Sequence, residues 1–286
     1  MPTPPAQPLA STHSLLHLTE LTMTQAKHKI WFQGATDRVA HAAYITPLEA
    51  HMKRIIDPAF SYSFNTTTPP ATTTHPVTEF RMARNFMKNA VKAEQEGYSV
   101  MAISHFQDAG LAEVKSLVDI PVLGLGETTM YFACTLGRKF GLVTINPTFI
   151  PWHEDQVIRY GLQQRCVGVR AVDCKVSDFM DAFATEEGYA KLAPKFQREV
   201  NLLLDAGADV IVPAGGLPML MFGGEQSHRK LKIETGGAPI INGLTVLCKS
   251  AEAAVRMHQL DGIGVSRRSN YAKPPEVALR EFLEQG

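Results

Sequence analysis

The 286-residue sequence lacks the features that mark several large classes of protein. No apolar run approaches the roughly 20 residues that a membrane-spanning helix needs. The first 26 residues have neither the basic start nor the long apolar stretch of a secretory signal. Because 28 Lys and Arg balance 28 Asp and Glu, no excess charge attracts nucleic acid or an anionic membrane. We therefore expect a cytoplasmic protein with a small-molecule substrate and with neither a nucleic-acid nor a membrane partner.

Cysteine is scarce, and no pair of cysteines has the C-x-x-C spacing. The chain has four, which favours a reducing compartment over a disulfide scaffold. All four fall inside helical or strand patterns rather than at loop ends, which is typical of core residues and not of nucleophiles. They are Cys134, Cys166, Cys174 and Cys248.

Several catalytic and cofactor motifs are also missing. The sequence has no G-x-S-x-G elbow and no phosphate-binding G-x-x-x-x-G-K-[ST] loop. His153-Glu154 does not begin a zinc-binding H-E-x-x-H motif, because Val157 stands where the second His would be. Gly124-Leu125-Gly126 resembles a dinucleotide fingerprint only in part, since Thr129 replaces its third glycine. We expect neither a metal nor a cofactor.

Short apolar runs alternate with helical stripes along the chain, a pattern that predicts an α/β protein with mostly parallel sheets flanked by helices. The runs are bounded by Gly, Pro or Asn, as buried parallel strands often are. A last helix is predicted from Pro275, with Val277, Leu279, Phe282 and Leu283 buried. The predicted strands are Ile30–Phe32, Phe60–Phe64, Val100–Ser104, Pro121–Leu123, Phe140–Ile145, Val167–Val172, Val210–Val212 and Pro239–Ile241.

An internal repeat indicates two similar halves. Glu96–Ala102 matches Ala206–Val212 at an offset of 110 residues, and Pro121–Leu123 matches Pro239–Ile241 at an offset of 118. We expect two pseudo-symmetric Rossmann-like lobes with the active site in the cleft between them. The predicted divisions are a mobile tail over residues 1–26, a first lobe over 27–122 and 245–286, and a second lobe over 123–244.

The loops that follow the predicted strands carry the candidate site residues. His105 follows one strand and opens a helix, and imidazole is the side chain that titrates near neutral pH, as a general acid or base requires. Asp108, three residues on, either orients His105 or caps the helix. The repeat makes Gly215 the equivalent of His105, and Gly216 follows it. Glycines and hydroxyls in two further loops are candidates for holding an anionic substrate group: Gly124, Gly126, Thr128 and Thr129 in one, and Gln33 and Thr36 in the other.

These segments together resemble the aspartate/glutamate/hydantoin racemase superfamily, and the hydantoin racemase branch in particular. The resemblance covers roughly residues 29–265 and rests on His105–Leu111, Pro121–Glu127, Lys139–Thr144 and Gly207–Gly216. It implies two lobes around a substrate, no cofactor, and two cysteines that exchange protons on opposite faces of an acidic carbon. It also makes a homo-oligomer the expected assembly.

Both family cysteine positions differ in this sequence. The resemblance places the first on His105 and the second on Gly215, so the two-thiol mechanism does not carry over. One-sided chemistry by His105 is then expected, as an isomerase, a lyase (decarboxylase) or a hydrolase acting on a small carboxylate or a hydantoin-like cyclic amide. A hydrolase with a His105-activated water, a metal-dependent hydrolase that adds Asp108 and His228, and a non-catalytic ligand-binding protein are the alternatives. Glu225 and His228 are candidates for a lid that supplies a second acid or base.

Overall fold

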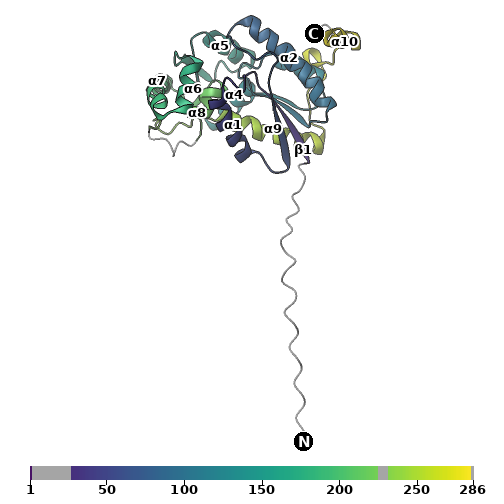
Figure 1. Ribbon diagram of the computed structural model, residues 1–286, viewed down its shortest axis with the longest axis horizontal. Coiled ribbons are helices and arrows are strands. Elements are labelled where there is room, and N and C mark those ends of the chain that lie inside the picture. Colours follow the sequence, from purple (N-terminus) through teal and green to yellow (C-terminus); the bar gives the residue numbers. More distant parts are fainter. Residues whose placement is uncertain (2–26, 225–230, 285–286) are drawn as a thin grey trace.

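The computed structural model describes residues 1, 27–224 and 231–284. Its strands form two parallel sheets, with the orders β2-β1-β3-β4 and β6-β5-β7. We call the parts of the molecule around these sheets the first and second lobes (Figure 1). The strands are β1 (His28–Gln33), β2 (Phe60–Asn65), β3 (Val100–Ile103), β4 (Val122–Gly124), β5 (Phe140–Thr144), β6 (Cys166–Ala171) and β7 (Val210–Pro213).

Helices connect and cover the strands, which confirms the predicted α/β class. They are α1 (Ala42–Ile55), α2 (Pro76–Gln95), α3 (Leu111–Leu117), α4 (Leu125–Leu136), α5 (Phe149–Arg159), α6 (Val176–Ala184), α7 (Glu186–Asp205), α8 (Gly216–Phe222), α9 (Gly243–Asp261) and α10 (Glu276–Glu284), with a 3₁₀ turn at Ser269–Tyr271. No helix in the described part of the chain is both long and apolar enough to span a membrane.

The two sheets repeat each other in strand pairing. Ile30 pairs with Val100 in the first lobe, and Phe140 pairs with Val210 in the second, so both partners move by 110 residues. The predicted strand Pro239–Ile241 is reduced to one parallel bridge, between Ile240 and Ile211. That bridge is the equivalent of the pair between Val122 and Met101, with offsets of 118 and 110. The structure therefore carries the same offsets that the sequence repeat predicts.

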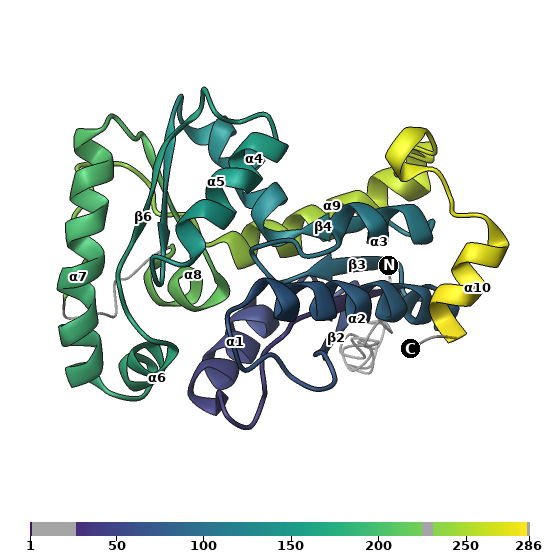
Figure 2. The same cartoon turned by 90° about the horizontal axis from the view of Figure 1, so that it is seen from above.

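Alternation along the strands explains how one core serves both lobes. Side chains at equivalent positions of the two sheets belong to a single buried cluster, to which α1, α4 and α9 also contribute. Strand residues on the opposite face of the first sheet pack against α2 and α3 instead. Figure 2 shows α9 crossing the middle of the molecule between the lobes. The equivalent pairs in the shared cluster are Ile30 and Phe140, Phe32 and Leu142, Val100 and Val210, and Ala102 and Val212.

Helix α2 has a well-defined start and one buried stripe. Its N-cap His75 accepts a hydrogen bond from the amide of Val77 through Nδ1, and Pro76 occupies the first helical position, where no amide hydrogen is needed. Four apolar residues at helical spacing face the first sheet, so the orientation of the helix is fixed by burial. They are Met82, Phe86, Ala90 and Ala93. This orientation determines where the first turn of α2 points.

The prediction for the last helix is correct in position and wrong in burial. Helix α10 starts one residue after Pro275, but none of its residues is buried, and Val277 is 52% exposed. Only Leu279 packs against a core cluster, that of the first lobe. The reason is its place at the outer end of the first lobe (Figure 2), where only one side of the helix meets the protein. Apolar spacing indicates which residues share a face, but it does not show how much of that face is covered.

Candidate active site

His105 follows the carboxyl end of β3 and is held by side chains of α2. Its Nε2 lies 2.8 Å from Oε2 of Glu79, and its ring packs edge-on against Phe86. Both partners are partly buried, with side-chain exposures of 17% for His105 and 19% for Glu79. An ionised carboxylate only accepts hydrogen bonds, so Nε2 carries a hydrogen, and in the neutral ring Nδ1 then presents a lone pair. Among the described residues, Nδ1 has no hydrogen-bond partner.

The Asp108 side chain does not bond the imidazole of His105, so the alternative that it orients the ring is wrong; its backbone amide donates to the carbonyl of His105 (3.0 Å). Its buried carboxylate accepts hydrogen bonds from the amides of Gly126 (3.1 Å) and Glu127 (2.6 Å) and from the hydroxyl of Tyr160 (2.6 Å). It therefore caps α4 from a neighbouring loop, rather than the helix that follows it in sequence. Burial raises the pKa of Asp108 to about 7, against the lowering effect of these three donors.

Because Asp108 caps α4, part of the loop from Gly124 to Thr129 is not available to bind substrate. The amide of Gly126 is already used, and a Cβ on Gly126 would overlap the carbonyl oxygen of Phe106. The expectation that this amide binds substrate is therefore wrong. Thr129 is fully buried and donates to the carbonyl of Leu125 (2.6 Å), so its hydroxyl is also unavailable. Thr128 is half-buried and forms no side-chain hydrogen bond with the described residues.

Gly124 and Gln33 were also expected to bind substrate, and both have structural roles instead. A Cβ on Gly124 would overlap the Asp108 carboxylate, so this glycine makes room for the cap. Gln33 is fully buried, which corrects its assignment as a substrate-binding side chain. Its amide oxygen accepts from Trp31 (3.0 Å) and Asn89 (2.8 Å), and its amide nitrogen donates to the carbonyl of Gly34 (2.9 Å). Thr36, by contrast, is half-buried, and its hydroxyl has no hydrogen-bond partner in the described chain.

Helix α5 joins the His105 loop to the second lobe, a connection that the sequence analysis missed. Gln156 donates to the carbonyl of Phe106 (2.7 Å) and accepts from Nδ1 of His153 (2.7 Å). Nε2 of His153 lies 3.2 Å from the hydroxyl of Thr144 at the end of β5, and this hydroxyl donates to the carbonyl of Ala214 (3.3 Å). Burial lowers the pKa of His153 to about 4, so the ring is neutral at pH 7. The signal in the sequence was the helical spacing of His153, Gln156 and Tyr160, which places all three on one face.

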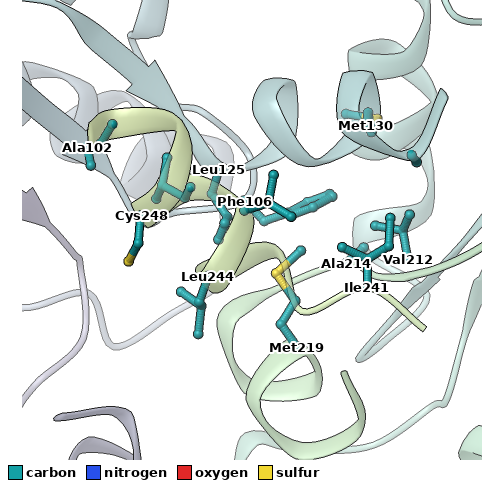
Figure 3. Close-up of a cluster of buried hydrophobic side chains, with 14 of the residues drawn as sticks. Ala102, Phe106, Leu125, Met130, Val212, Ala214, Met219, Ile241, Leu244 and Cys248 are labelled. Carbon is teal, nitrogen blue, oxygen red and sulfur yellow. The ribbon is translucent and has the colours of Figure 1, made fainter. Parts of the chain in front are cut away.

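The equivalent loop of the second lobe starts at Gly215, after β7. Gly215 has φ 141° and ψ 153°, a conformation that is essentially restricted to glycine. Apart from its chain neighbours, only the ring of Pro218 among the described residues lies within 4 Å of where its Cβ would be, at 3.4 Å or more, so a Cβ would fit there sterically. The preceding residue, Ala214, lies in the shared core with Phe106, and Figure 3 shows the Phe106 ring directed toward Ala214. The loops that carry His105 and Gly215 thus approach each other across the shared core.

The four cysteines are free, and none belongs to these two loops. Burial raises the pKa of every one of them, to about 11 for Cys166 and about 12 for Cys248. Thiolates are therefore disfavoured at neutral pH. Within residues 27–224 and 231–284, no three His, Cys, Asp or Glu side chains are arranged to hold a metal ion. Glu225 and His228, the candidates for a lid, lie outside the described residues.

Two cavities are lined by other residues of the protein. One, of about 570 Å³, is lined by residues of α1 and β2, among them Glu49 and Tyr62. The other, of about 370 Å³, lies between β4, α9 and the segment that follows α9, with Leu123 and Met257 in its lining. Neither is lined by His105 or Gly215, so the candidate site is defined by its loops.

The fold is that of a two-lobed α/β protein with equivalent loops after β3 and β7. The model of the family described as Asp/Glu/Hydantoin racemase matches residues 42–251, and the chain belongs to this family. A hydantoin racemase of Rhizobium meliloti is 28% identical over 73% of this chain and 80% of its own. One from a Pseudomonas species is 29% identical over 68% of this chain and 71% of its own.

Solved structures support the same fold. The allantoin racemase of Klebsiella pneumoniae superposes with a TM-score of 0.71 and 21% identity, covering 87% of this chain and 94% of the other. The resemblance of this sequence to the hydantoin racemase branch is therefore confirmed, as are the parallel sheets flanked by helices.

Proposed function

We propose that this protein is a cofactor-independent acid/base enzyme that moves a proton at a carbon beside a carbonyl group, with His105 as the base. The observation that carries the proposal is the pair formed by His105 Nε2 and Glu79 Oε2 at 2.8 Å. The pair fixes one tautomer and leaves Nδ1 as the free basic atom. The hydantoin racemases to which the chain is similar act, by their name, on hydantoins, so the proposed substrate class is a hydantoin-like cyclic amide, with small carboxylates as the next class.

The proposed reaction has one base on one face. Nδ1 of His105 takes the proton from the acidic carbon, and the C–H electron pair moves onto the carbonyl oxygen to give an enolate. Hydrogen-bond donors around that oxygen lower the energy of the charge. Return of the proton from the imidazolium completes an exchange. Gly215 offers no proton-handling group on the second face, so exchange is expected to be faster than inversion.

Donors for the substrate remain in both lobes. The hydroxyls of Thr36 and Thr128 and the backbone amides of Gly215 and Gly216 form no hydrogen bonds with other described residues, so we assign them to substrate binding. Gln33, Gly126 and Thr129 are excluded from this set, because their polar groups are already bonded within the protein. This division follows from the rule that buried polar groups are satisfied by one partner or another.

Proton NMR in D2O tests the proposal directly. The wild-type protein is incubated with a panel of 5-substituted hydantoins, amino-acid carboxylates and arylmalonates, each beside a protein-free control. We expect loss of the signal of the acidic proton as deuterium enters, with no change elsewhere in the molecule. Absence of exchange across the panel, with ligand signals broadened by the protein, would instead favour a non-catalytic binding protein.

Replacing the accessible cysteines tests the choice of His105 over a thiol. We expect Cys134→Ser and Cys166→Ser to exchange deuterium at the wild-type rate, because burial raises the pKa of both thiols. Iodoacetamide is likewise expected to leave the wild-type rate unchanged. A tenfold or greater loss in either variant, with its thermal unfolding midpoint unchanged, would contradict the assignment to His105.

The alternative reaction, hydrolysis of a cyclic amide, is favoured by the absence of a side chain at Gly215. A Cβ on Gly215 would fit in ordinary contact with Pro218, at 3.4 Å, and we propose that the room left by the missing side chain admits a water molecule. In that reaction His105 would deprotonate the water, and the water would attack the carbonyl carbon of a cyclic amide. The same NMR samples separate the two reactions, because ring opening produces new signals and exchange alone does not.

A further inference from the structure

Tyr44 carries a buried hydroxyl without a partner. The residue lies near the start of α1 and is only 6% exposed, and its hydroxyl forms no hydrogen bond with any described residue. Other deeply buried polar groups in the protein are bonded: Gln33, Asp108 and His153 each have two or more partners. Burial also raises the pKa of Tyr44, so its hydroxyl keeps the proton and acts as a donor. A buried donor without an acceptor costs free energy unless a ligand supplies one.

The Tyr44 hydroxyl lies against the loop of the second lobe. A Cβ on Gly216 would stand 2.6 Å from its oxygen, so glycine at this position keeps the space around the hydroxyl open. The Tyr44 ring packs against Phe183 of α6, with ring centroids 5.6 Å apart. Tyr44 also belongs to the shared core that contains Phe106 and Ala214, the neighbours in sequence of His105 and Gly215. Figure 2 shows α1 reaching toward α6 and α8 at the boundary between the lobes.

We propose that Tyr44 is a catalytic hydrogen-bond donor, which binds the carbonyl oxygen of a hydantoin-like substrate from the side of Gly215 and Gly216. The proposal rests on the function proposed above. When His105 removes the proton from carbon, the new N–H bond replaces the C–H bond, and the electron pair resides on the carbonyl oxygen. The Tyr44 O–H donates to this oxygen without losing its proton. A side chain from the first lobe thereby occupies the neighbourhood of Gly215, the position where the family resemblance places the second thiol.

The test compares Tyr44→Phe with Tyr189→Phe. Tyr189 is a matched control, because it is also buried (1% exposed, against 6% for Tyr44) and its hydroxyl donates to the carbonyl of Leu231 at 2.9 Å. We expect Tyr44→Phe to slow deuterium exchange into a 5-substituted hydantoin by about 10²–10³-fold, as loss of an oxyanion donor does. Its thermal unfolding midpoint should equal or exceed that of the wild type, since an unpaired buried hydroxyl is removed. Tyr189→Phe should show the reverse: a lower midpoint and an unchanged exchange rate.

Two results would overturn the role of Tyr44. One is a Tyr44→Phe midpoint that falls as far as that of Tyr189→Phe, which would mean that the hydroxyl has an internal partner; this arm needs no substrate. The other is exchange by Tyr44→Phe at the wild-type rate. His105→Ala separates this failure from failure of the proposed function. Loss of exchange in His105→Ala alone refutes only the role of Tyr44, whereas loss in Tyr44→Phe alone refutes only the assignment of the base.

Discussion

Replacing His105 by alanine is expected to lower the rate of deuterium exchange by about 10²–10⁴-fold, the range typical for loss of a general base. The variant should keep the wild-type unfolding midpoint to within a few degrees, because the side chain is only partly buried and has one hydrogen-bond partner. Added imidazole should restore part of the rate in His105→Ala, since the deletion leaves space for it. The measurement is exchange by NMR with and without imidazole.

Glu79 is expected to affect the exchange rate only through its hydrogen bond to His105. Glu79→Gln keeps the shape but loses the charge that holds the imidazole, and we expect a loss of roughly 10²-fold, the cost of a misplaced catalytic group. The double variant Glu79→Gln/His105→Ala should be no slower than His105→Ala alone, because two residues that act as a unit are not additive. His258→Ala is the control and should keep the wild-type rate, because His258 is a surface residue whose ring contacts the carbonyl of Ile263. Additive losses in the double variant would contradict the pairing.

Asp108→Asn is expected to change how stability depends on pH. Since the folded state holds the pKa of Asp108 at about 7 and the unfolded chain at 3.8, the folded state binds the extra proton between these values. Stability from this carboxyl is therefore present at pH 4 and lost as pH rises to 7, by about 4 kcal/mol in all. The neutral amide has no such loss. We expect the difference in unfolding free energy between the two proteins to move by that amount in favour of the variant from pH 4 to pH 8.

Urea unfolding of both proteins at each pH is the measurement. Taking the difference cancels the other titrating groups, among them His153. Its lowered pKa acts in the opposite direction, because the unfolded chain binds the proton first as pH falls below 6.5. A difference that does not change with pH, or that moves in favour of the wild type, would show that the three donors to Asp108 outweigh its burial.

The strands and the repeat could be predicted because both depend on local sequence. Short apolar runs ended by Gly, Pro or Asn are nearly sufficient for buried parallel strands, and seven of the eight predicted runs form strands in the described chain. The offsets of 110 and 118 residues recur in the strand pairing, since equivalent residues must meet equivalent partners. The eighth run, Pro239–Ile241, forms a single bridge, and α10 lies on the outer surface. The length of a strand pairing and the burial of a helix both depend on distant parts of the chain, so local sequence does not predict them.

The candidate site was predicted only in part, for a related reason. Position after a strand correctly indicates that His105 lies in a loop at the carboxyl end of the sheet. Position does not show which polar groups are already hydrogen-bonded within the protein. Gln33 and Asp108 also follow strands, yet both side chains are buried and hydrogen-bonded within the protein. Glu79, 26 residues before His105 in the chain, reaches it only because the buried stripe of α2 turns the first helical turn toward β3.

The sequence by itself determined the class of fold, the duplication and the loop that carries His105, because apolar periodicity and turn residues act over a few positions at a time. The tertiary structure decided which polar groups are paired and which stay available. It assigned Asp108 to the cap of α4 and Glu79 to His105, and it left the hydroxyl of Tyr44 beside Gly216. These outcomes depend on contacts between residues far apart in the chain, where burial requires that each polar group find a partner.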